Sequence, residues 1–213
     1  NPGAGPEPTQ SMVPVPTGSG TPAPSASATT GVPDSGSGGG TTSSSDPSGT
    51  GGAGKTINNA YTTGYTWFDN TPRGSAQISA PVLHKEAGGT GTYADPITLA
   101  VGHSTAGGKD TLDYPAGTRF YMPRVRRYFI VEDACGDGGS PQNGPCHSLE
   151  TAPEGATTWL DMYVGGDSGD NESAVQDCTD KVTGLTTVVQ DPGPNLPVVE
   201  GPLFQNGKCT ELY

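Results

Sequence analysis

The sequence predicts an all-β domain of about six strands with one short helix, preceded by a disordered tail, and three observations lead to this prediction. From about residue 56 onward, short segments rich in β-branched and aromatic residues alternate with clusters of Gly, Pro, Asn and Asp. A single segment has the features of a helix. The first 55 residues show no hydrophobic periodicity.

Residues 1–55 consist almost entirely of Pro, Gly, Ser, Thr and Ala, as in PVPTGSGTPAPSASATTG. Such a segment buries too little apolar surface to fold, so we expect a disordered linker or a free tail. Its density of Ser and Thr suits O-glycosylation. The chain begins with Asn rather than Met, which indicates a processed or truncated form.

The strands that we expect have period-two patterns and are bounded by turn residues. They are residues 61–69, 96–102, 117–123, 126–134, 157–165 and 185–191. The helix is expected at residues 173–183, with Ser173 as its N-cap. Six short strands and one helix within residues 56–213 are typical of a small β-barrel or sandwich.

The composition excludes several classes of partner. A formal net charge of −12 argues against nucleic acid and anionic membranes. No apolar run approaches the roughly 18 residues that a membrane span needs. We therefore expect a monomer that binds neither nucleic acid nor membrane.

Four cysteines lie in the C-terminal part of the chain: Cys135, Cys146, Cys178 and Cys209. Their even number predicts two disulfides in a secreted, extracellular protein, with three pairings open. Because no C-x-x-C occurs, we expect no zinc site, and nothing else in the sequence predicts a metal or cofactor. The sequon at Asn171 predicts an exposed, N-glycosylated loop.

The pattern Trp-x-Asp occurs twice. In TTWLDMYVGG, Trp159, Asp161 and Tyr163 share one strand face, while residues 160, 162 and 164 face a core. An aromatic ring stacks on the apolar face of a sugar, and a carboxylate beside it reaches the hydroxyls or the glycosidic oxygen. A carboxyl group against an aromatic wall also tends to have the raised pKa that a general acid needs.

In YTTGYTWFDN, Tyr65, Trp67 and Asp69 alternate onto one face in the same way. The alternative for both patterns is that the Trp is a core or edge residue and the Asp begins a turn. A third candidate carboxylate is Asp133 in YFIVEDACGD. Its neighbour Glu132 points to the opposite face, so only one of the two lines a given cleft.

Other features carry weaker predictions. Arg119, Arg124, Arg126 and Arg127 either grip an acidic substrate or balance neighbouring carboxylates. His147 follows Cys146 and is expected to be solvated rather than a metal ligand. No motif for a nucleophilic Ser or for phosphate binding occurs.

The stretches DYPAGTRFYMPRVRRYFIVEDACGD and WLDMYVGG resemble the core of the double-psi β-barrel proteins of cell-wall metabolism. Among these are expansins, family 45 glycoside hydrolases and the barrel of lytic transglycosylases. TWFDNTPRGSA and AGGTGTYADPITLAVG are similar to segments of secreted microbial, largely fungal, expansin-like proteins. The resemblance covers residues 61–210 and implies a six-stranded double-psi β-barrel domain at 56–213.

The same resemblance implies roles for three aspartates. Asp161 matches the general acid of the hydrolases and transglycosylases, Asp69 stands where family 45 enzymes have their base, and Asp133 matches the V-E-D phrase. The chain departs from the pattern in having Trp159-Leu160-Asp161 in place of His-Phe-Asp. It also lacks the G-A-C-G phrase of expansins and the extra cysteines of family 45.

From these observations we expect a secreted carbohydrate-active barrel that acts on a β-1,4-linked cell-wall polysaccharide such as cellulose, another β-glucan, chitin or peptidoglycan. As a glycosidase or lytic transglycosylase it would use Asp161 as acid and Asp69 as base. The residues expected to contact the glycan are Trp67, Trp159, Tyr163 and Tyr65. The alternatives are a non-catalytic, expansin-like wall-loosening or carbohydrate-binding protein, and a structural or inhibitory barrel.

Overall fold

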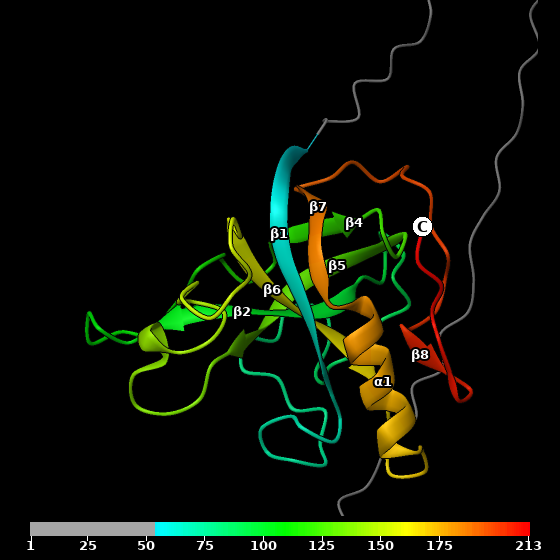
Figure 1. Ribbon diagram of the computed structural model, residues 1–213, viewed down its shortest axis with the longest axis horizontal. Coiled ribbons are helices and arrows are strands. Elements are labelled where there is room, and N and C mark those ends of the chain that lie inside the picture. The colour runs from blue at the N-terminus through cyan, green and yellow to red at the C-terminus, as the bar shows by residue number, and fades with distance from the viewer. Residues whose placement is uncertain (1–53) are drawn as a thin grey trace, which may run out of the picture. The chain divides into compact units, whose positions relative to one another are not determined.

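The computed structural model describes residues 54–213. Apart from residues 54 and 55, the predicted tail and its O-glycosylation lie outside these residues. The main strands are β1 (Lys55–Thr66), β2 (Ile97–Ser104), β4 (Arg119–Met122), β5 (Arg127–Cys135), β6 (Thr158–Gly165) and β7 (Gly184–Gln190) (Figure 1). Shorter elements are β3 (Thr111–Leu112), β8 (Phe204–Gln205), β9 (Lys208–Cys209) and the 3-10 turn η1 (Pro141–Asn143). The one α-helix is α1 (Glu172–Val182).

The six main strands form a closed ring of hydrogen-bonded neighbours in the order β2-β5-β4-β7-β1-β6, and β6 pairs with β2 again. The β1–β6 and β2–β5 pairs are parallel, and the other pairs of the ring are antiparallel. The prediction of an all-β domain with six strands and one short helix is therefore confirmed. Because the ring is closed, each of the six strands has a hydrogen-bonded neighbour on both sides.

The pairing has a two-fold pattern that follows the chain. If β1, β2 and β4 are exchanged with β5, β6 and β7 in that order, each pair maps onto a pair of the same direction. The first strand of each half therefore lies parallel to the second strand of the other half. This interleaving brings segments about 100 residues apart in the chain, such as β1 and β6, side by side.

The core of the ring comes from the alternate residues that the period-two patterns predicted. Leu160, Met162 and Val164 of β6 are at most 1% exposed. They pack with apolar side chains of the other strands, among them Leu99, Val101, Phe129, Val131 and Val188. Burial of aliphatic and aromatic side chains on this scale is the main favourable term in folding.

Strand β1 differs from the expected strand at both ends. It begins at Lys55, because a bulge between Ile57 and Ala60 accommodates Asn59 with a φ of 55°. It ends at Thr66, where the Oδ1 atom of Asp69 accepts hydrogen bonds from the backbone N–H and the hydroxyl of Thr66. The predicted alternation of Tyr65, Trp67 and Asp69 along one strand face is therefore wrong, since the chain turns at Thr66.

Helix α1 lies beside β1 in Figure 1 and contacts it, and its buried residues are Val175, Cys178, Thr179 and Val182. Its N-cap is Asn171 rather than the expected Ser173, because the Asn171 side chain accepts a hydrogen bond from the Ala174 N–H.

The close approach of α1 depends on a glycine in β1. A Cβ atom on Gly64 would lie 2.6 Å from a methyl group of Val164 and 3.3 Å from Thr179.

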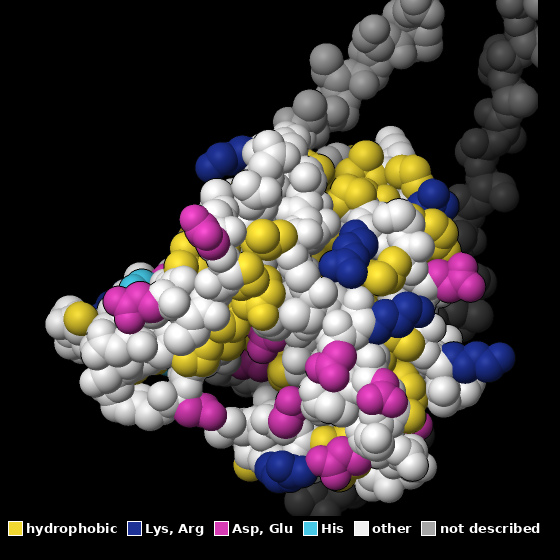
Figure 2. All heavy atoms as spheres, in the orientation of Figure 1, with side chains coloured by type: hydrophobic (Ala, Val, Ile, Leu, Met, Phe, Trp, Pro, Cys, Tyr) yellow, Lys and Arg dark blue, Asp and Glu magenta, His cyan; other side chains and the backbone are white. Residues whose placement is uncertain are grey.

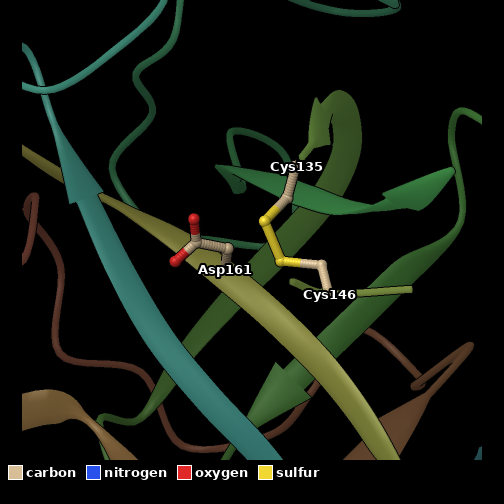
Figure 3. A group of neighbouring side chains, drawn as sticks. All are labelled: Cys135, Cys146 and Asp161. Carbon is tan, nitrogen blue, oxygen red and sulfur yellow. A yellow bond between two sulfur atoms is a disulfide. The ribbon is translucent and has the colours of Figure 1, made fainter. Parts of the chain in front are cut away.

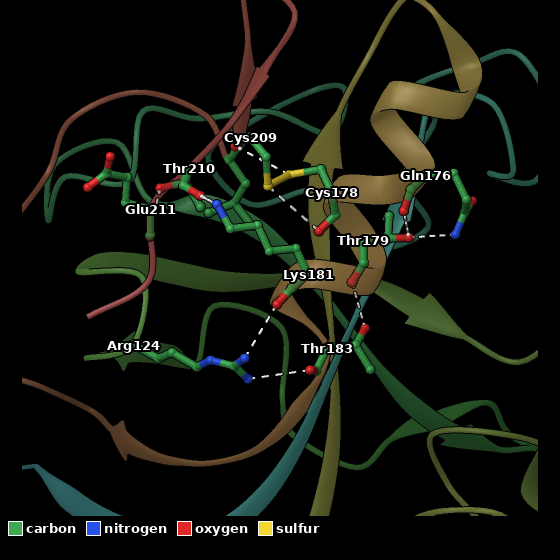
Figure 4. Close-up of a disulfide and its surroundings, with 10 residues drawn as sticks. Arg124, Gln176, Cys178, Thr179, Lys181, Thr183, Cys209, Thr210 and Glu211 are labelled. Atoms are coloured by element: carbon green, nitrogen blue, oxygen red, sulfur yellow. Dashed lines mark hydrogen bonds between the residues drawn. A yellow bond between two sulfur atoms is a disulfide. The ribbon is translucent and has the colours of Figure 1, made fainter.

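Both predicted disulfides form, with the pairings Cys135–Cys146 and Cys178–Cys209. The second joins α1 to β9 (Figure 4). Beside it, the Lys181 ammonium donates to the carbonyl of Thr210, and Arg124 donates to the carbonyls of Lys181 and Thr183. The C-terminal segment is thus tied to the end of the helix by covalent and polar contacts.

A bulge in β5 fixes the loop that precedes β2. The register with β2 steps between Leu99 and Ala100, which pair with Val131 and Asp133, so Glu132 is an extra residue. The Glu132 side chain is fully buried and accepts hydrogen bonds from the backbone N–H groups of residues 82, 83 and 84. These bonds tie the loop to the ring.

The same carboxylate binds the imidazole of His84. Nδ1 of His84 lies 2.7 Å from Glu132, and Nε2 lies 2.8 Å from Asp95. Burial lowers the pKa of His84, but its bonds to Asp95 and Glu132 outweigh burial and place the pKa above the usual value. Burial raises the pKa of Glu132, and the bonds from the His84 and Leu83 N–H groups and the imidazole bring it below the usual value.

Glu132→Ala is predicted to destabilise the domain by about 3–5 kcal/mol, because it leaves three backbone N–H groups and the His84 imidazole without their acceptor. Urea unfolding followed by tryptophan fluorescence measures this loss. Glu154→Ala, which removes an exposed carboxylate without a hydrogen-bond partner among residues 54–213, is the matched control and should change stability by less than about 0.5 kcal/mol. Equal stability of the two variants would contradict the anchoring role of Glu132.

Candidate functional site: a groove over the ring

The site is built on one row of residues that crosses four neighbouring strands. Thr63 of β1 pairs with Asp161 of β6, Asp161 pairs with Ala100 of β2, and Ala100 pairs with Asp133 of β5. Directly paired residues point to the same face of a sheet. The small side chain of Ala100 therefore separates two carboxylates on one face, with a hydroxyl beside the first of them.

A groove of about 640 Å³ lies over this row. All four residues of the row line it. Its other lining residues include Tyr65, Asp69, Ser79, His103, Asp110, Cys135, Asp137 and Trp159. A concave site of this volume, with aromatic and carboxylate side chains together, is large enough for a small ligand or a few units of a polymer.

Asp161 is the carboxyl group with the most altered acidity in the groove. Burial raises its pKa to about 7, the nearby charges of Asp69 and Asp133 act in the same direction, and a hydrogen bond from Thr63 opposes them in part. The Thr63 hydroxyl donates to Oδ1 of Asp161 over 2.6 Å. Asp161 is therefore largely protonated in mildly acidic solution, as a general acid must be before it acts.

Trp159 is connected to Asp161 through the hydroxyl of Thr63. Nε1 donates to the Thr63 hydroxyl over 2.8 Å, and the ring packs at 4.9 Å between centroids against Tyr61. Two hydrogen bonds thus connect Trp159 to Asp161 through Thr63. Sequence reasoning placed Trp159 and Asp161 on one face but missed Thr63, because only the pairing of β1 with β6 brings this threonine to the carboxylate.

The Cys135–Cys146 disulfide forms the wall next to Asp161 (Figure 3). Both sulfur atoms and a carboxylate oxygen of Asp161 lie within 4.8 Å of one another. Because the two sulfurs are bonded to each other, they are not thiolate ligands for a metal ion. They contribute instead to the burial that raises the pKa of Asp161.

Asp133 has a different environment from Asp161. Its Oδ1 accepts from the N–H and the hydroxyl of Ser79 and from the N–H of Ala134, and its Oδ2 accepts from the Tyr65 hydroxyl. It is 7% exposed. Four donors leave this carboxylate well satisfied, so its side chain joins the loop at Ser79 to the ring. As expected, Glu132 does not line the same groove.

Asp69 is exposed and also lines the groove. One of its oxygens is held by Thr66, as described above, which places the side chain at the turn after β1. The two aspartates of the predicted acid–base pair therefore face one groove. The same geometry also fits the alternative interpretation, in which Asp69 begins a turn.

Of the four aromatic residues expected at a glycan, the groove includes Tyr65 and Trp159 but not Trp67 or Tyr163. Trp67 makes an edge contact with Phe68 and lies over Gly74. Tyr163 is 6% exposed and packs against Tyr65 at 5.3 Å between ring centroids. Tyr163 therefore supports a lining residue from behind, whereas Trp67 packs away from the groove.

One end of the groove holds a pair that the sequence did not single out. Nδ1 of His103 lies 2.7 Å from Asp110, and Nε2 lies 2.8 Å from the carbonyl of Gly136. Burial lowers the pKa of His103, but these two acceptors outweigh burial and raise it above the usual value. Nearby, the hydroxyl of Thr71 donates a hydrogen bond to Asp137, which lies 66 residues away in the sequence.

The arginines of the predicted basic cluster do not meet at the groove. They bind backbone carbonyls or aromatic rings at separate places. Arg119 donates to the Tyr93 carbonyl, Arg127 to the carbonyls of Gly201 and Val125, and Arg126 lies over the Tyr213 ring. Among residues 54–213 these arginines therefore neither line the groove, as a substrate clamp would, nor form ion pairs with carboxylates.

Comparison with known proteins identifies a family. Residues 57–210 match the family described as the DDB_G0273701 N-terminal domain. The chain belongs to this family. A segment of 71 residues is 45% identical to "Uncharacterized protein DDB_G0273701/DDB_G0273221" of Dictyostelium discoideum, and covers 33% of this chain and 28% of that protein. No solved structure matches the chain.

The region that matches the DDB_G0273701 N-terminal domain family includes the whole ring except the first two residues of β1. It therefore includes the row of four residues under the groove: Thr63, Asp161, Ala100 and Asp133. Two disulfides in this domain are consistent with an extracellular protein. Within residues 54–213, no helix is long and apolar enough to cross a bilayer.

Figure 2 shows Asp and Glu side chains of this family member gathered around α1, which carries Glu172, Asp177 and Asp180, with single Lys and Arg side chains elsewhere on the same face. The groove follows the same trend, because its lining contains five aspartates and one histidine but no Lys or Arg.

Asp161→Asn is predicted to stabilise the domain at pH 8 by about 2 kcal/mol. A carboxyl whose pKa rises from 3.8 to about 7 on folding contributes stability that is complete below pH 3.8 and is lost as the pH rises through 7. An amide at this position does not ionise and still accepts from Thr63. Urea unfolding at pH 5 and pH 8 should show the gain growing with pH.

Asp133→Asn is the matched control and should destabilise the domain at both pH values, since an amide cannot accept all four hydrogen bonds. Destabilisation by Asp161→Asn at pH 8 would contradict the raised pKa of Asp161.

Proposed function

We propose that this chain is a secreted, carbohydrate-active member of the double-psi β-barrel group, and that its groove binds a β-1,4-linked cell-wall polysaccharide and cleaves it. The observation that carries the proposal is the placement of Asp161 on the floor of an open groove, linked to Trp159 through Thr63 and facing the same space as Asp69, where burial raises its pKa to about 7. The interleaved parallel pairs of the ring support the resemblance to the double-psi barrels.

In this proposal Asp161 donates its proton to the glycosidic oxygen. Its pKa of about 7 keeps it protonated in mildly acidic surroundings, so no other group has to supply the proton. Asp69 is exposed at the groove and activates the attacking water from its free oxygen. Water attack of this kind yields a reducing end with inverted configuration when the carboxyl groups are roughly 6.5–9.5 Å apart.

Asp133 has a supporting role in the proposed mechanism. Its carboxylate is occupied by Ser79, Tyr65 and its own neighbour, so it has no free position for a water or a proton. Its negative charge helps to keep Asp161 protonated.

The charge of the groove bears on the choice of polymer. The four aspartates of the lining other than Asp161, without Lys or Arg beside them, repel uronic acids, phosphates and other anionic polymers. Neutral polymers such as cellulose, mannan, xylan and chitin are therefore favoured over peptidoglycan. Trp159 and Tyr65 offer apolar contact for the sugar rings.

A second candidate is a non-catalytic, expansin-like wall-loosening or carbohydrate-binding protein. It is favoured by the two bonds from Thr66 to Asp69, which explain that carboxylate as part of a turn. Without a positioned base, two outcomes remain open. The groove either binds the glycan without cleaving it, or Asp161 assists an intramolecular attack that leaves a 1,6-anhydro end.

The test is product release from cellulose, mannan, xylan, chitin and peptidoglycan, followed by mass spectrometry. Soluble fragments are expected from a neutral polymer, with a rate that falls as the pH rises through about 7. Asp161→Asn should slow release about 10²–10⁴-fold, the usual contribution of a general acid. Asp177→Asn, which changes an exposed aspartate on α1 away from the groove, should leave the rate unchanged.

The ends of the fragments identify the chemistry, because reducing ends indicate hydrolysis and anhydro ends indicate transglycosylation. Fragments that Asp161→Asn releases as fast as the wild type would contradict the role of Asp161. No fragments, together with retention of the protein on one polymer, would support the second candidate.

A further inference from the structure

We infer that the indole N–H of Trp159 acts through Thr63 as a positioning group, which keeps the acidic proton of Asp161 on Oδ2. The inference deepens the proposed function and rests on it for its catalytic meaning. The hydrogen bonds themselves are present in the resting protein, where they are open to direct measurement.

The direction of the two bonds follows from the chemistry of the groups. An indole nitrogen is a donor only, so the 2.8 Å contact makes the Thr63 hydroxyl an acceptor. The single proton of that hydroxyl then points away from the indole, toward Oδ1 of Asp161 at 2.6 Å. Because Oδ1 accepts this proton, the carboxylic proton of Asp161 resides on Oδ2.

The described residues offer Asp161 no substitute for this donor. Thr63 is the one group between residues 54 and 213 that hydrogen-bonds to the Asp161 side chain. Asp69 and Asp133 face it as acceptors, and the Tyr65 hydroxyl is already donated to Asp133. His103 is bonded at both nitrogens, to Asp110 and to Gly136. The disulfide wall has no proton to donate.

The arrangement does not change with pH. An indole N–H stays protonated throughout the accessible range, whereas a histidine at this place titrates near neutral pH. Trp159 therefore holds the Thr63 hydroxyl in one orientation whether Asp161 is protonated or charged. Without the indole, the hydroxyl is free to rotate and to accept a proton from Oδ1 instead.

The test is a double-mutant cycle that measures the titration of Asp161. The carboxyl carbon is followed by NMR in protein labelled with ¹³C at aspartate, and Asp161→Asn assigns its signal. Thr63→Val should raise the titration midpoint by about one pH unit, because the charged form loses its donor. Thr63→Ser keeps the hydroxyl and should restore the wild-type midpoint.

Trp159→Phe should raise the midpoint by a smaller amount, because it leaves Thr63 without its orienting donor. In the Thr63→Val background, the same change should have no further effect, since the group through which it acts is gone. Trp67→Phe, which alters the other tryptophan outside the groove, should leave the midpoint unchanged. Thr63→Ala replaces Thr63→Val in the cycle if the valine variant does not fold.

Equal shifts from Trp159→Phe in both backgrounds would overturn the inference, because they would show that the ring acts by burial alone. No shift in either background would overturn it as well. The proposed function fails separately, if the cycle behaves as stated while no polymer is cleaved or bound. Cleavage that depends on Asp161 together with an additive cycle would leave the function standing without the inference.

Discussion

The bulge at Glu132 is the constraint on which the groove depends. Since directly paired residues share a face, the extra residue turns Asp133 to the side of Ala100 and Asp161. In a regular ladder Asp133 would stand opposite Val101 and point into the core. The bulged residue Glu132 also has a structural role, because its buried carboxylate accepts hydrogen bonds from the backbone N–H groups of residues 82–84. One inserted residue therefore sets both the floor of the groove and the loop beside it.

Three carboxylates at one groove have three environments, and their roles follow from these. Asp161 has one donor and lies against a disulfide, and its burial near two other carboxylates favours its neutral form. Asp133 accepts four hydrogen bonds, which fix its side chain in place. Asp69 is exposed to solvent at the rim. Environments that separate the acidities of neighbouring carboxyl groups are the usual means by which a protein distinguishes an acid from a base.

Local pattern was sufficient for much of the fold. Alternation placed Leu160, Met162 and Val164 in the core and Asp161 on the opposite face, and turn residues located five of the six main strands within two residues at each end. The local pattern could not predict which residues meet across paired strands. Thr63 sits in a strand with many threonines and carries no signal of its own until β6 lies beside it. The end of β1 was missed because the Asp69–Thr66 bonds, which turn the chain, compete with a pattern that continues in sequence.

The most direct test of the account is the titration of the Asp161 carboxyl group in the wild-type protein, followed by ¹³C NMR from pH 3 to pH 9. The burial of Asp161 beside the disulfide, with Asp69 and Asp133 nearby, predicts a midpoint of about 7. A midpoint near 3.8, the value of a solvated aspartate, would contradict the account, because Asp161 would then be charged throughout the mildly acidic range and would have no proton to donate.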